Sequence, residues 1–170
     1  MKVELRVLQE SDREILATLM NNKKIWDNLK DYIPHPYHIE DADFFIDLTQ
    51  KQIPSQSFAI VNEQSELCGV ISLIKQDDIY RLTAELGYWI GEPYWGRGIA
   101  TQAIELITDY GFKELKLERI YAGVFDFNKA SRKVLEKNGY QLEGILRNAI
   151  VKNAIIRDEY RYAKLKNEQH

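Results

Sequence analysis

Three runs rich in β-branched and aromatic residues follow one another between residues 57 and 91, with only short polar segments between them. They read SFAIVN, LCGVISLIK and RLTAELGYWIG, and the connecting segments EQSE and QDDIY suit hairpin turns. Strands joined this closely pair antiparallel, because a parallel pair needs a crossover of a dozen or more residues. An antiparallel meander in the middle of the chain is therefore the first constraint on the fold.

The segments on either side of this meander show further helix and strand patterns. The predicted helices cover about residues 12–20, 23–29, 40–51, 99–112 and 128–137. The predicted strands cover about residues 3–7, 57–62, 67–75, 81–91, 118–125, 140–151 and 155–165. Ser11–Asp12 is expected to cap the first helix, and Asn138–Gly139 is expected to end the last one.

The order of these elements predicts an α+β fold with one parallel crossover, because a helix and a strand follow the meander. We expect a single domain over residues 1–170. Its core would be a central, mixed, mostly antiparallel twisted sheet of about seven strands, flanked by helices. Only the last few residues are expected to be frayed.

Composition limits the classes of partner. Hydrophobic residues make up 45% of the chain and charged residues 29%, and the net charge is −3. Such a chain offers no overall basic field, so neither direct nucleic-acid binding nor membrane binding is expected. The first twelve residues resemble neither a signal peptide nor a transit peptide, and no run approaches the roughly 18 apolar residues of a membrane span. We expect a cytoplasmic protein.

Cysteine and histidine usage argues against two kinds of site. The single cysteine, Cys68, excludes an internal disulfide and suits a reducing compartment. Because it lies in an apolar run, it is expected to be a small buried side chain rather than a nucleophile. His35 and His38 have no cysteine or carboxylate partner at a metal-ligand spacing, so no metal is expected.

Gly96, Arg97 and Gly98 stand between the third strand of the meander and a helix. Glycines at such a junction let backbone amides approach an anion at the positive end of the helix dipole, here the amides of about residues 96–101. A structural turn is the alternative. A P-loop would need Gly-Lys-Ser/Thr, which is absent. A dinucleotide fingerprint is disfavoured because Thr101 takes the place of its third glycine and antiparallel strands precede the loop.

The stretch ELGYWIGEPYWGRGIATQAI resembles the acetyl-coenzyme A loop of the GNAT N-acetyltransferases, whose pattern is Gln/Arg-x-x-Gly-x-Gly/Ala. In this alignment Trp95 takes the Gln/Arg place, Gly98 the fixed glycine and Ala100 the closing small residue. The Tyr-Trp-Gly-x-Gly-x-Ala form is similar to the ribosomal-protein N-terminal (Rim-type) acetyltransferase branch. NKKIWDNLKDYIPHPYHIEDADFFI, DFNKASRKVLEKNGYQLEG and RDEYRYAKL resemble that branch too, so the likeness covers nearly the whole chain.

The resemblance implies a GNAT-like fold with acetyl-coenzyme A (acetyl-CoA) as co-substrate. The amides of residues 96–101 would hold the pyrophosphate, and the strand end at residues 88–90 would pair with the pantetheine arm. The Ile90 amide would donate to the thioester carbonyl. Cofactor-binding residues would be Tyr88, Trp89, Ile90, Trp95, Gly96, Arg97, Gly98, Ile99, Ala100, Thr101 and Asn128. Plain strand packing is the alternative for Tyr88 and Ile90, and an N-cap is the alternative for Asn128.

The resemblance also suggests how the leaving thiolate is handled. The family commonly has a Tyr seven residues after the position of Asn128, and here that position is Leu135. The acid of the Rim-type branch corresponds to Ser131, which is then the candidate catalytic residue. A hydroxyl is a poor acid for a thiolate, since a thiol has a pKa of about 8.5, so Ser131 would stabilise the sulfur by hydrogen bonding. A structural role for Ser131 is the alternative.

Glu85 is the candidate base, because an acid on this strand matches many family members. A carboxyl pKa of about 4.3 requires it to act through water or through burial. A surface or internally paired glutamate is the alternative. The later glutamate proposed as base in the enzyme acting on the ribosomal stalk protein falls on Ile150 here. Weaker candidates for the base are Asp77, Asp78 and Glu143.

The acceptor wall is expected in the segment of aromatics and prolines that follows the second helix. Its candidate substrate-binding residues are Trp26, Asn28, Tyr32, Pro36 and Tyr37, for which packing onto the core is the alternative. The predicted function is N-acetyl transfer to a primary amine, either a protein or peptide N-terminus or a small molecule, directly in a ternary complex. A non-catalytic coenzyme A-binding sensor is the alternative. The protein could be a monomer or a homodimer.

Overall fold

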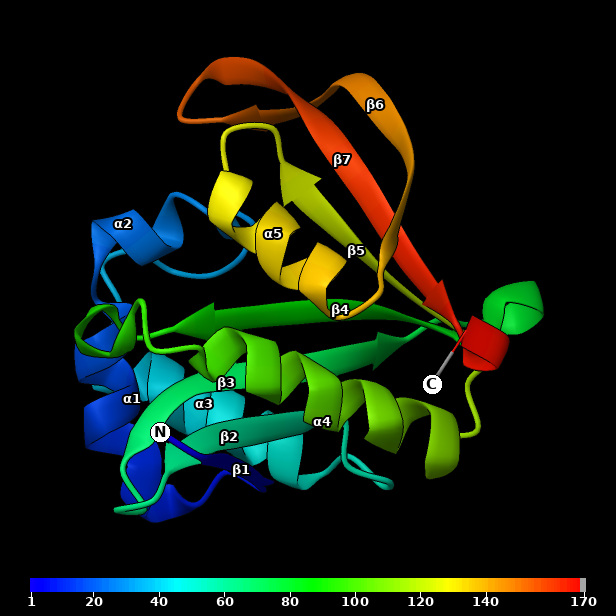
Figure 1. The fold of residues 1–170 in the computed structure, drawn as a ribbon. Coiled ribbons are helices and arrows are strands. Elements are labelled where there is room, and N and C mark those ends of the chain that lie inside the picture. Colours follow the sequence, from blue (N-terminus) through cyan, green and yellow to red (C-terminus); the bar gives the residue numbers. More distant parts are fainter. Residues whose placement is uncertain (169–170) are drawn as a thin grey trace. The chain divides into compact units, whose positions relative to one another are not determined.

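The computed structural model describes residues Met1–Glu168, and Figure 1 shows its elements in chain order. The strands are β1 (Val3–Arg6), β2 (Ser57–Asn62), β3 (Leu67–Lys75), β4 (Thr83–Ile90), β5 (Arg119–Phe125), β6 (Gln141–Lys152) and β7 (Ile155–Leu165). The α-helices are α1 (Arg13–Met20), α2 (Lys23–Trp26), α3 (Ile39–Gln50), α4 (Ile99–Lys113) and α5 (Lys129–Lys137). The predicted fraying concerns the last residues, of which 169–170 lie outside the described part.

The strands form one seven-stranded sheet in the order β1-β2-β3-β4-β5-β7-β6. The β4–β5 pair is parallel, with Glu85 opposite Tyr121, whereas β1–β2, β2–β3, β5–β7 and β6–β7 are antiparallel. The meander is confirmed, since Gln76 N donates to Thr83 O at one end of the β3–β4 connection. The predicted α+β class and mixed, mostly antiparallel sheet are correct.

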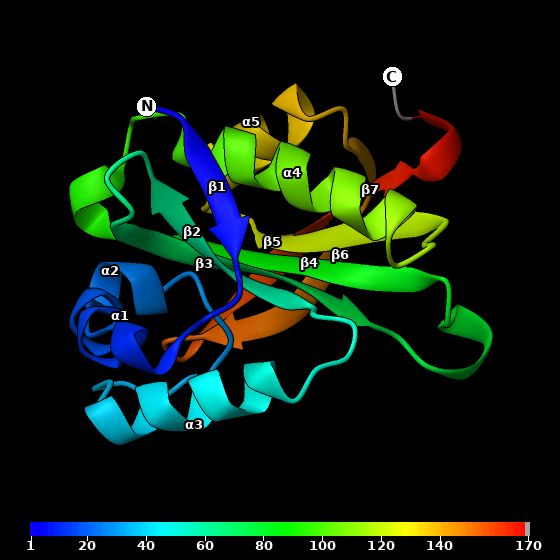
Figure 2. The ribbon, with the colours of Figure 1, turned by 90° about the horizontal axis from the view of Figure 1, so that it is seen from below.

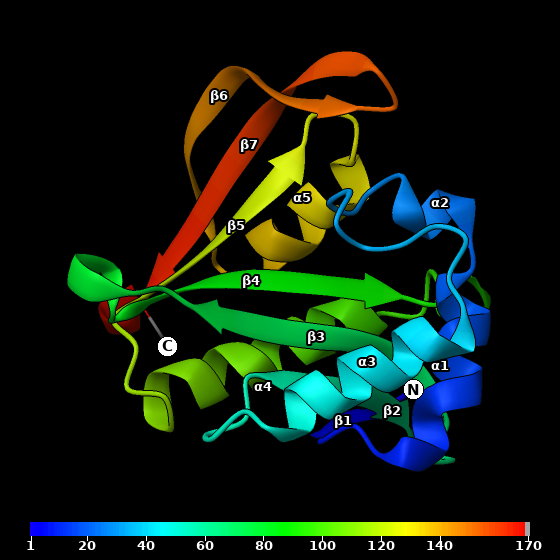
Figure 3. The ribbon, with the colours of Figure 1, turned by 180° about the vertical axis from the view of Figure 1, so that it is seen from behind.

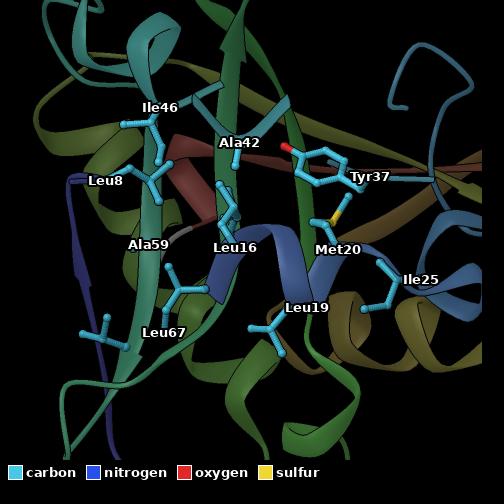
Figure 4. Close-up of a cluster of buried hydrophobic side chains, with 12 residues drawn as sticks. Leu8, Leu16, Leu19, Met20, Ile25, Tyr37, Ala42, Ile46, Ala59 and Leu67 are labelled. Atoms are coloured by element: carbon cyan, nitrogen blue, oxygen red, sulfur yellow. The ribbon is translucent and has the colours of Figure 1, made fainter. Parts of the chain in front are cut away.

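The residues group into two compact units. The first unit holds Met1–Ser72 and Tyr88–Ala103. In this unit α1 and α3 cover one face of β1 to β3 (Figure 3). Figure 2 shows the same two helices in a view turned by 90° about the horizontal axis from that of Figure 1. Apolar side chains of these elements, of α2 and of the connecting segments form a buried core, which Figure 4 draws as sticks. Its members are Leu8, Leu16, Leu19, Met20, Ile25, Tyr37, Ala42, Ile46, Ala59, Val61, Leu67 and Val70.

The second unit holds Leu73–Gly87 and the chain from Ile104 onward. Residues of β5 alternate between buried and half-buried, as expected of a strand with one covered face. Helix α5 lies against β7, where the Tyr162 hydroxyl donates to Glu136 at 2.8 Å. The helix ends as predicted, because Gly139 adopts a φ of +79° directly after Asn138.

Two local predictions were wrong at the helix ends. Helix α2 ends at Trp26 rather than at residue 29, and the chain continues in turns with short bonds such as Asn28 N to Ile25 O. Asp12 does not cap α1 with its side chain. Its buried carboxylate instead accepts two hydrogen bonds from Arg6, both at 2.8 Å, and one from the Gln9 amide. A charged partner is the stronger one for a buried carboxylate.

Candidate functional site

The connection between β4 and α4 has the backbone of an anion-binding loop. A short 3₁₀ turn over Glu92–Tyr94 leads to Gly96 and Gly98, whose φ angles are +72° and +73°. Apart from each glycine and its two chain neighbours, no described residue has an atom within 4 Å of a Cβ placed at Gly96 or Gly98. Both glycines are therefore required by the left-handed backbone rather than by crowding within the chain.

The 15-residue helix α4 starts directly after this loop, at Ile99. Its first turn presents amides that find no partner within the helix, at the positive end of the helix dipole. Ile99 is buried and anchors the turn, whereas Trp95 to Gly98 are exposed. Ala100 and Thr101 are half-buried. The predicted loop thus lies at the surface of the first unit, open to a ligand.

Trp95 closes the loop against the end of β4. Its indole Nε1–H donates to the Ile90 carbonyl oxygen at 2.7 Å. Ile90 is buried, and the half-buried Trp89 packs against the core of the first unit. Arg97 extends over the Tyr94 ring, with the guanidinium carbon 6.0 Å from the ring centroid. The predicted donor-site residues from Tyr88 to Thr101 thus lie along one continuous stretch of this unit.

Glu92 ties the loop to α2. Its carboxylate accepts hydrogen bonds from the Lys24 ammonium group and from Asn22 Nδ2, the latter at 2.7 Å. The Lys24 hydrogen bond holds the pKa of Glu92 below its ordinary value, with the Asn22 bond as the next cause. Sequence reasoning missed this contact. Its partners lie 68 and 70 residues away, and no local pattern marks them.

The predicted acceptor-wall residues fall into two groups. Asn28, Tyr32 and Pro36 are exposed, and Tyr32 reaches 73%. Trp26 is half-buried, donates its indole N–H to the Ile33 carbonyl oxygen at 2.8 Å, and stacks on a histidine ring. Tyr37 is buried in the core of the first unit.

Burial raises the pKa of Tyr37 to about 12, with the Asp41 charge as a second cause. Core packing is thus shown for Tyr37, as one of the two predicted alternatives. His35, which precedes Pro36 in the same segment, stacks its ring on that of Trp26 with ring centroids 5.3 Å apart. These contacts fix the path of the segment that carries the exposed residues.

Glu85 and Tyr121 lie opposite each other in the second unit, on adjacent parallel strands. The Tyr121 hydroxyl lies 3.4 Å from Glu85 Oε2 and donates to it. Arg161 lies over the Tyr121 ring, 4.9 Å from its centroid, and donates to Glu159 at 2.8 Å. Sequence reasoning missed Tyr121, because only the parallel register brings it opposite Glu85.

The weaker base candidates are held elsewhere in the second unit. Glu143 receives two hydrogen bonds from Arg119, at 2.6 and 2.7 Å, and its pKa is lowered chiefly by them. Asp78 begins the 3₁₀ turn between β3 and β4. Ile150 lies on β6 opposite Arg157. A carboxylate that accepts hydrogen bonds from an arginine, as that of Glu143 does, is a weaker base than an unpaired carboxylate.

Asn128 and Ser131 meet at the start of α5. Asn128 Oδ1 accepts a hydrogen bond from the Ser131 amide at 3.2 Å, so Asn128 is the N-cap of this helix. The capping role, one of the two alternatives for Asn128, is shown. Leu135, at the place of the family tyrosine, is fully buried. Cys68 is also fully buried, as predicted, and burial raises the pKa of its thiol to about 11.

Comparisons with known proteins identify the family to which this chain belongs. The acetyltransferase (GNAT) domain family matches residues 2–141. The probable N-acetyltransferase YjcK of Bacillus subtilis (strain 168) is 42% identical over 92 residues, which are 54% of this chain and about half, 51%, of that protein. Two relatives from Escherichia coli (strain K12) match over most of their length. The spermidine N(1)-acetyltransferase is 30% identical over 94% of this chain and 83% of its own. The ribosomal-protein-serine acetyltransferase is 28% identical over 98% and 94%.

A solved structure of an acetyltransferase has the same fold as this chain. The spermidine N-acetyltransferase from Vibrio cholerae, crystallised in complex with CoA and spermine, has a TM-score of 0.84 at 26% identity, covering 98% of this chain and 96% of its own. Within residues 1–168, no helix combines the length and apolarity that crossing a bilayer requires. The same residues hold no cluster of three or more His, Cys, Asp or Glu side chains arranged to bind a metal. The fold is the GNAT fold, and the chain belongs to the GNAT acetyltransferase family as an N-acetyltransferase.

Proposed function

We propose that this N-acetyltransferase takes its acetyl group from acetyl-CoA and moves it directly to a primary amine in a ternary complex, with the whole chain acting as one domain. The observation that carries the proposal is the loop before α4. Gly96 and Gly98 both have positive φ, and the exposed loop leads into the first turn of a 15-residue helix. This arrangement suits a pyrophosphate, because backbone amides and the helix dipole both favour an anion there.

The donor would run from this loop along the end of β4. CoA is present in the Vibrio cholerae relative's structure, which supports the same cofactor here. We propose that the backbone at Tyr88 to Ile90 pairs with the pantetheine arm in the manner of an added strand. The Ile90 amide would then donate to the thioester carbonyl and stabilise the charge that develops on its oxygen.

The chemical step requires one proton to move and one bond to be exchanged. The amine nitrogen attacks the thioester carbonyl carbon, a C–N bond forms, and the C–S bond breaks. We propose that Glu85 accepts the amine proton through water, and that the Ser131 hydroxyl donates a hydrogen bond to the departing sulfur. Asn128 would support Ser131 by capping α5, and it would also bond the cofactor arm.

The acceptor is proposed from chemistry shared by two relatives. One is a spermidine acetyltransferase and the other a ribosomal-protein-serine acetyltransferase, so both kinds of acceptor present an amine. We propose an acceptor of one of these two classes, a polyamine or a protein N-terminus. It would bind against Trp26 and the exposed Asn28, Tyr32 and Pro36. Family membership favours this catalytic function over the non-catalytic sensor.

The test is turnover of acetyl-CoA with two matched panels of acceptors. One panel holds spermidine, spermine and putrescine, and the other holds short peptides with free serine, alanine or methionine N-termini. Release of the CoA thiol measures the rate, and mass spectrometry identifies the acetylated product. Turnover of only one panel assigns the acceptor class. If the protein binds acetyl-CoA and neither panel is acetylated, the proposed acceptor classes are wrong.

A further inference from the structure

The peptide group between Ile90 and Gly91 is held at both ends. Its carbonyl oxygen accepts from the Trp95 indole N–H at 2.7 Å, and its N–H donates to the Cys68 carbonyl oxygen at 2.7 Å. Both atoms belong to one planar group, so the two bonds together fix its orientation. This peptide group is the last of β4 and the first of the loop that leads to Gly96.

The backbone around this peptide group has little room to move. A Cβ at Gly91 would lie 2.9 Å from the Leu19 Cδ2 atom, and a Cβ at Gly69 would overlap the Trp89 carbonyl oxygen. The strand end is thus packed closely against both α1 and β3. The loop beyond it is exposed, and the Trp95 indole reaches back from that loop to the strand. The indole bond therefore sets how the loop leaves the fixed strand end.

We infer that Trp95 is a positioning residue that holds the loop amides in register with the end of β4, acting through the Ile90 carbonyl oxygen. The inference rests on the proposed function, in which the loop holds the pyrophosphate of CoA and the strand end holds its pantetheine arm. A cofactor that binds at both places gains affinity when their spacing is fixed, because its second contact then forms within the complex rather than from free solution. A ligand that touches only the loop gains nothing from the spacing.

The part of Trp95 that matters is its N–H group. In tryptophan the Nε1 atom is the fourth atom along the side chain after Cα, and glutamine and histidine also carry a nitrogen at that place. Phenylalanine keeps a ring of similar character but has no donor. Trp95 is 45% exposed, so its replacement opens no large cavity in the core. The series Trp95→Phe, Trp95→Gln and Trp95→His therefore separates the hydrogen bond from the ring.

The experiment measures Kd by titration calorimetry for CoA and for ADP, which carries the pyrophosphate without the pantetheine arm. In Trp95→Phe we expect the Kd for CoA to rise about tenfold and the Kd for ADP to change by less than about twofold. In Trp95→Gln or Trp95→His we expect the Kd for CoA to return to within about threefold of the wild-type value. Thermal unfolding of each variant checks that the fold is kept.

Four results would overturn the inference. Trp95→Gln and Trp95→His could bind CoA as weakly as Trp95→Phe, which would assign the effect to the ring. ADP could lose as much affinity as CoA, which would mean that the loop itself collapses. Wild-type protein that binds neither ligand would refute the proposed function and this inference with it. Wild-type binding with an unaffected Trp95→Phe variant would refute the inference alone.

Discussion

Glu85 lies on β4 with its carboxylate beside the Tyr121 hydroxyl of the parallel neighbour. If Glu85 relays the amine proton, Glu85→Gln removes the carboxylate that takes up the proton. It keeps the shape of the side chain and an oxygen that can accept the Tyr121 hydrogen bond. We expect kcat/KM for the amine to fall by about 100-fold or more, with CoA binding unchanged. The matched control is Glu105→Gln, on the exposed surface of α4. Equal activity in both variants would show that Glu85 is not the base.

Ser131 offers a second test at the level of one side chain. Its backbone amide is bound to Asn128, and this bond does not depend on the hydroxyl. We expect Ser131→Ala to lower kcat by about tenfold, because one hydrogen bond to the leaving sulfur is lost, while the KM for acetyl-CoA stays nearly constant. Ser131→Thr keeps a hydroxyl and should restore most of the rate. An unchanged kcat in the alanine variant would leave Ser131 with a structural role.

The Arg6–Asp12 pair makes stability depend on pH. Burial raises the pKa of Asp12, but the hydrogen bonds from Arg6 and the Gln9 amide outweigh it, so the pKa lies below the ordinary value. A carboxyl whose folded pKa is depressed stabilises the fold above its unfolded pKa of about 3.9, and this contribution is lost as the pH falls through the folded pKa. We expect Asp12→Asn to lower the free energy of unfolding by about 2 kcal/mol at pH 7. By urea unfolding, the difference from wild type should shrink as the pH is lowered below about 4. A constant difference would contradict this assignment.

At the level of elements, the turn from β4 into α4 depends on backbone conformation at Gly98. An alanine there would have to adopt a φ of +73°, which costs about 1–2 kcal/mol for a residue with a Cβ. We expect Gly98→Ala to lower the free energy of unfolding by about 1 kcal/mol and to weaken CoA binding more than tenfold, because the loop amides turn away. Chemical unfolding and calorimetry measure the two effects.

Gly144 supplies the matched control for this turn. It has open space around its Cβ position, as Gly98 has, but its φ is not in the left-handed region. Gly144→Ala should therefore change neither CoA binding nor stability by more than about 0.5 kcal/mol. If Gly98→Ala behaved like this control, the loop would not need its left-handed glycine for the cofactor.

For the whole molecule, binding of the donor links function to stability. A ligand that binds only the folded state at about 100 times its Kd adds about 2.7 kcal/mol to the free energy of unfolding. We expect acetyl-CoA to raise the unfolding temperature, with a dependence on its concentration, whereas acetyl phosphate at equal concentration should have little effect. No shift with acetyl-CoA at millimolar concentration would refute the proposed donor site.

Much of the architecture could be predicted because it follows from local patterns. Three apolar runs separated by polar turns predict the meander, and Asn138–Gly139 predicts the end of α5. The loop could be found for the same reason, since the positive φ angles of Gly96 and Gly98 are a local requirement that glycine alone meets without strain. The roles assigned to Glu85 and Ser131 follow from the resemblance and stay predictions.

Other features depend on partners that the fold brings from a distance. Asp12 is expected to cap the first helix, but its carboxylate makes no capping bond to α1. It accepts hydrogen bonds from Arg6 and from the Gln9 amide, and the charged partner is the stronger one for a buried carboxylate. Tyr37 was predicted as acceptor wall or core, and packing with α1 and α3 placed it in the core. Glu92 and Lys24 form an ion pair across 68 residues.

The sequence by itself determined the order of the elements and the conformation of the loop, because φ preferences, strand alternation and helix spacing act over a few residues. Only the tertiary structure decided which side chains meet. It placed Tyr121 opposite Glu85 through the parallel register, and it directed the Trp95 indole to the Ile90 carbonyl oxygen. The physical reason is that a hydrogen bond or ion pair forms where packing has already brought its two groups within about 3 Å, and packing is set by the burial of apolar surface over the whole chain.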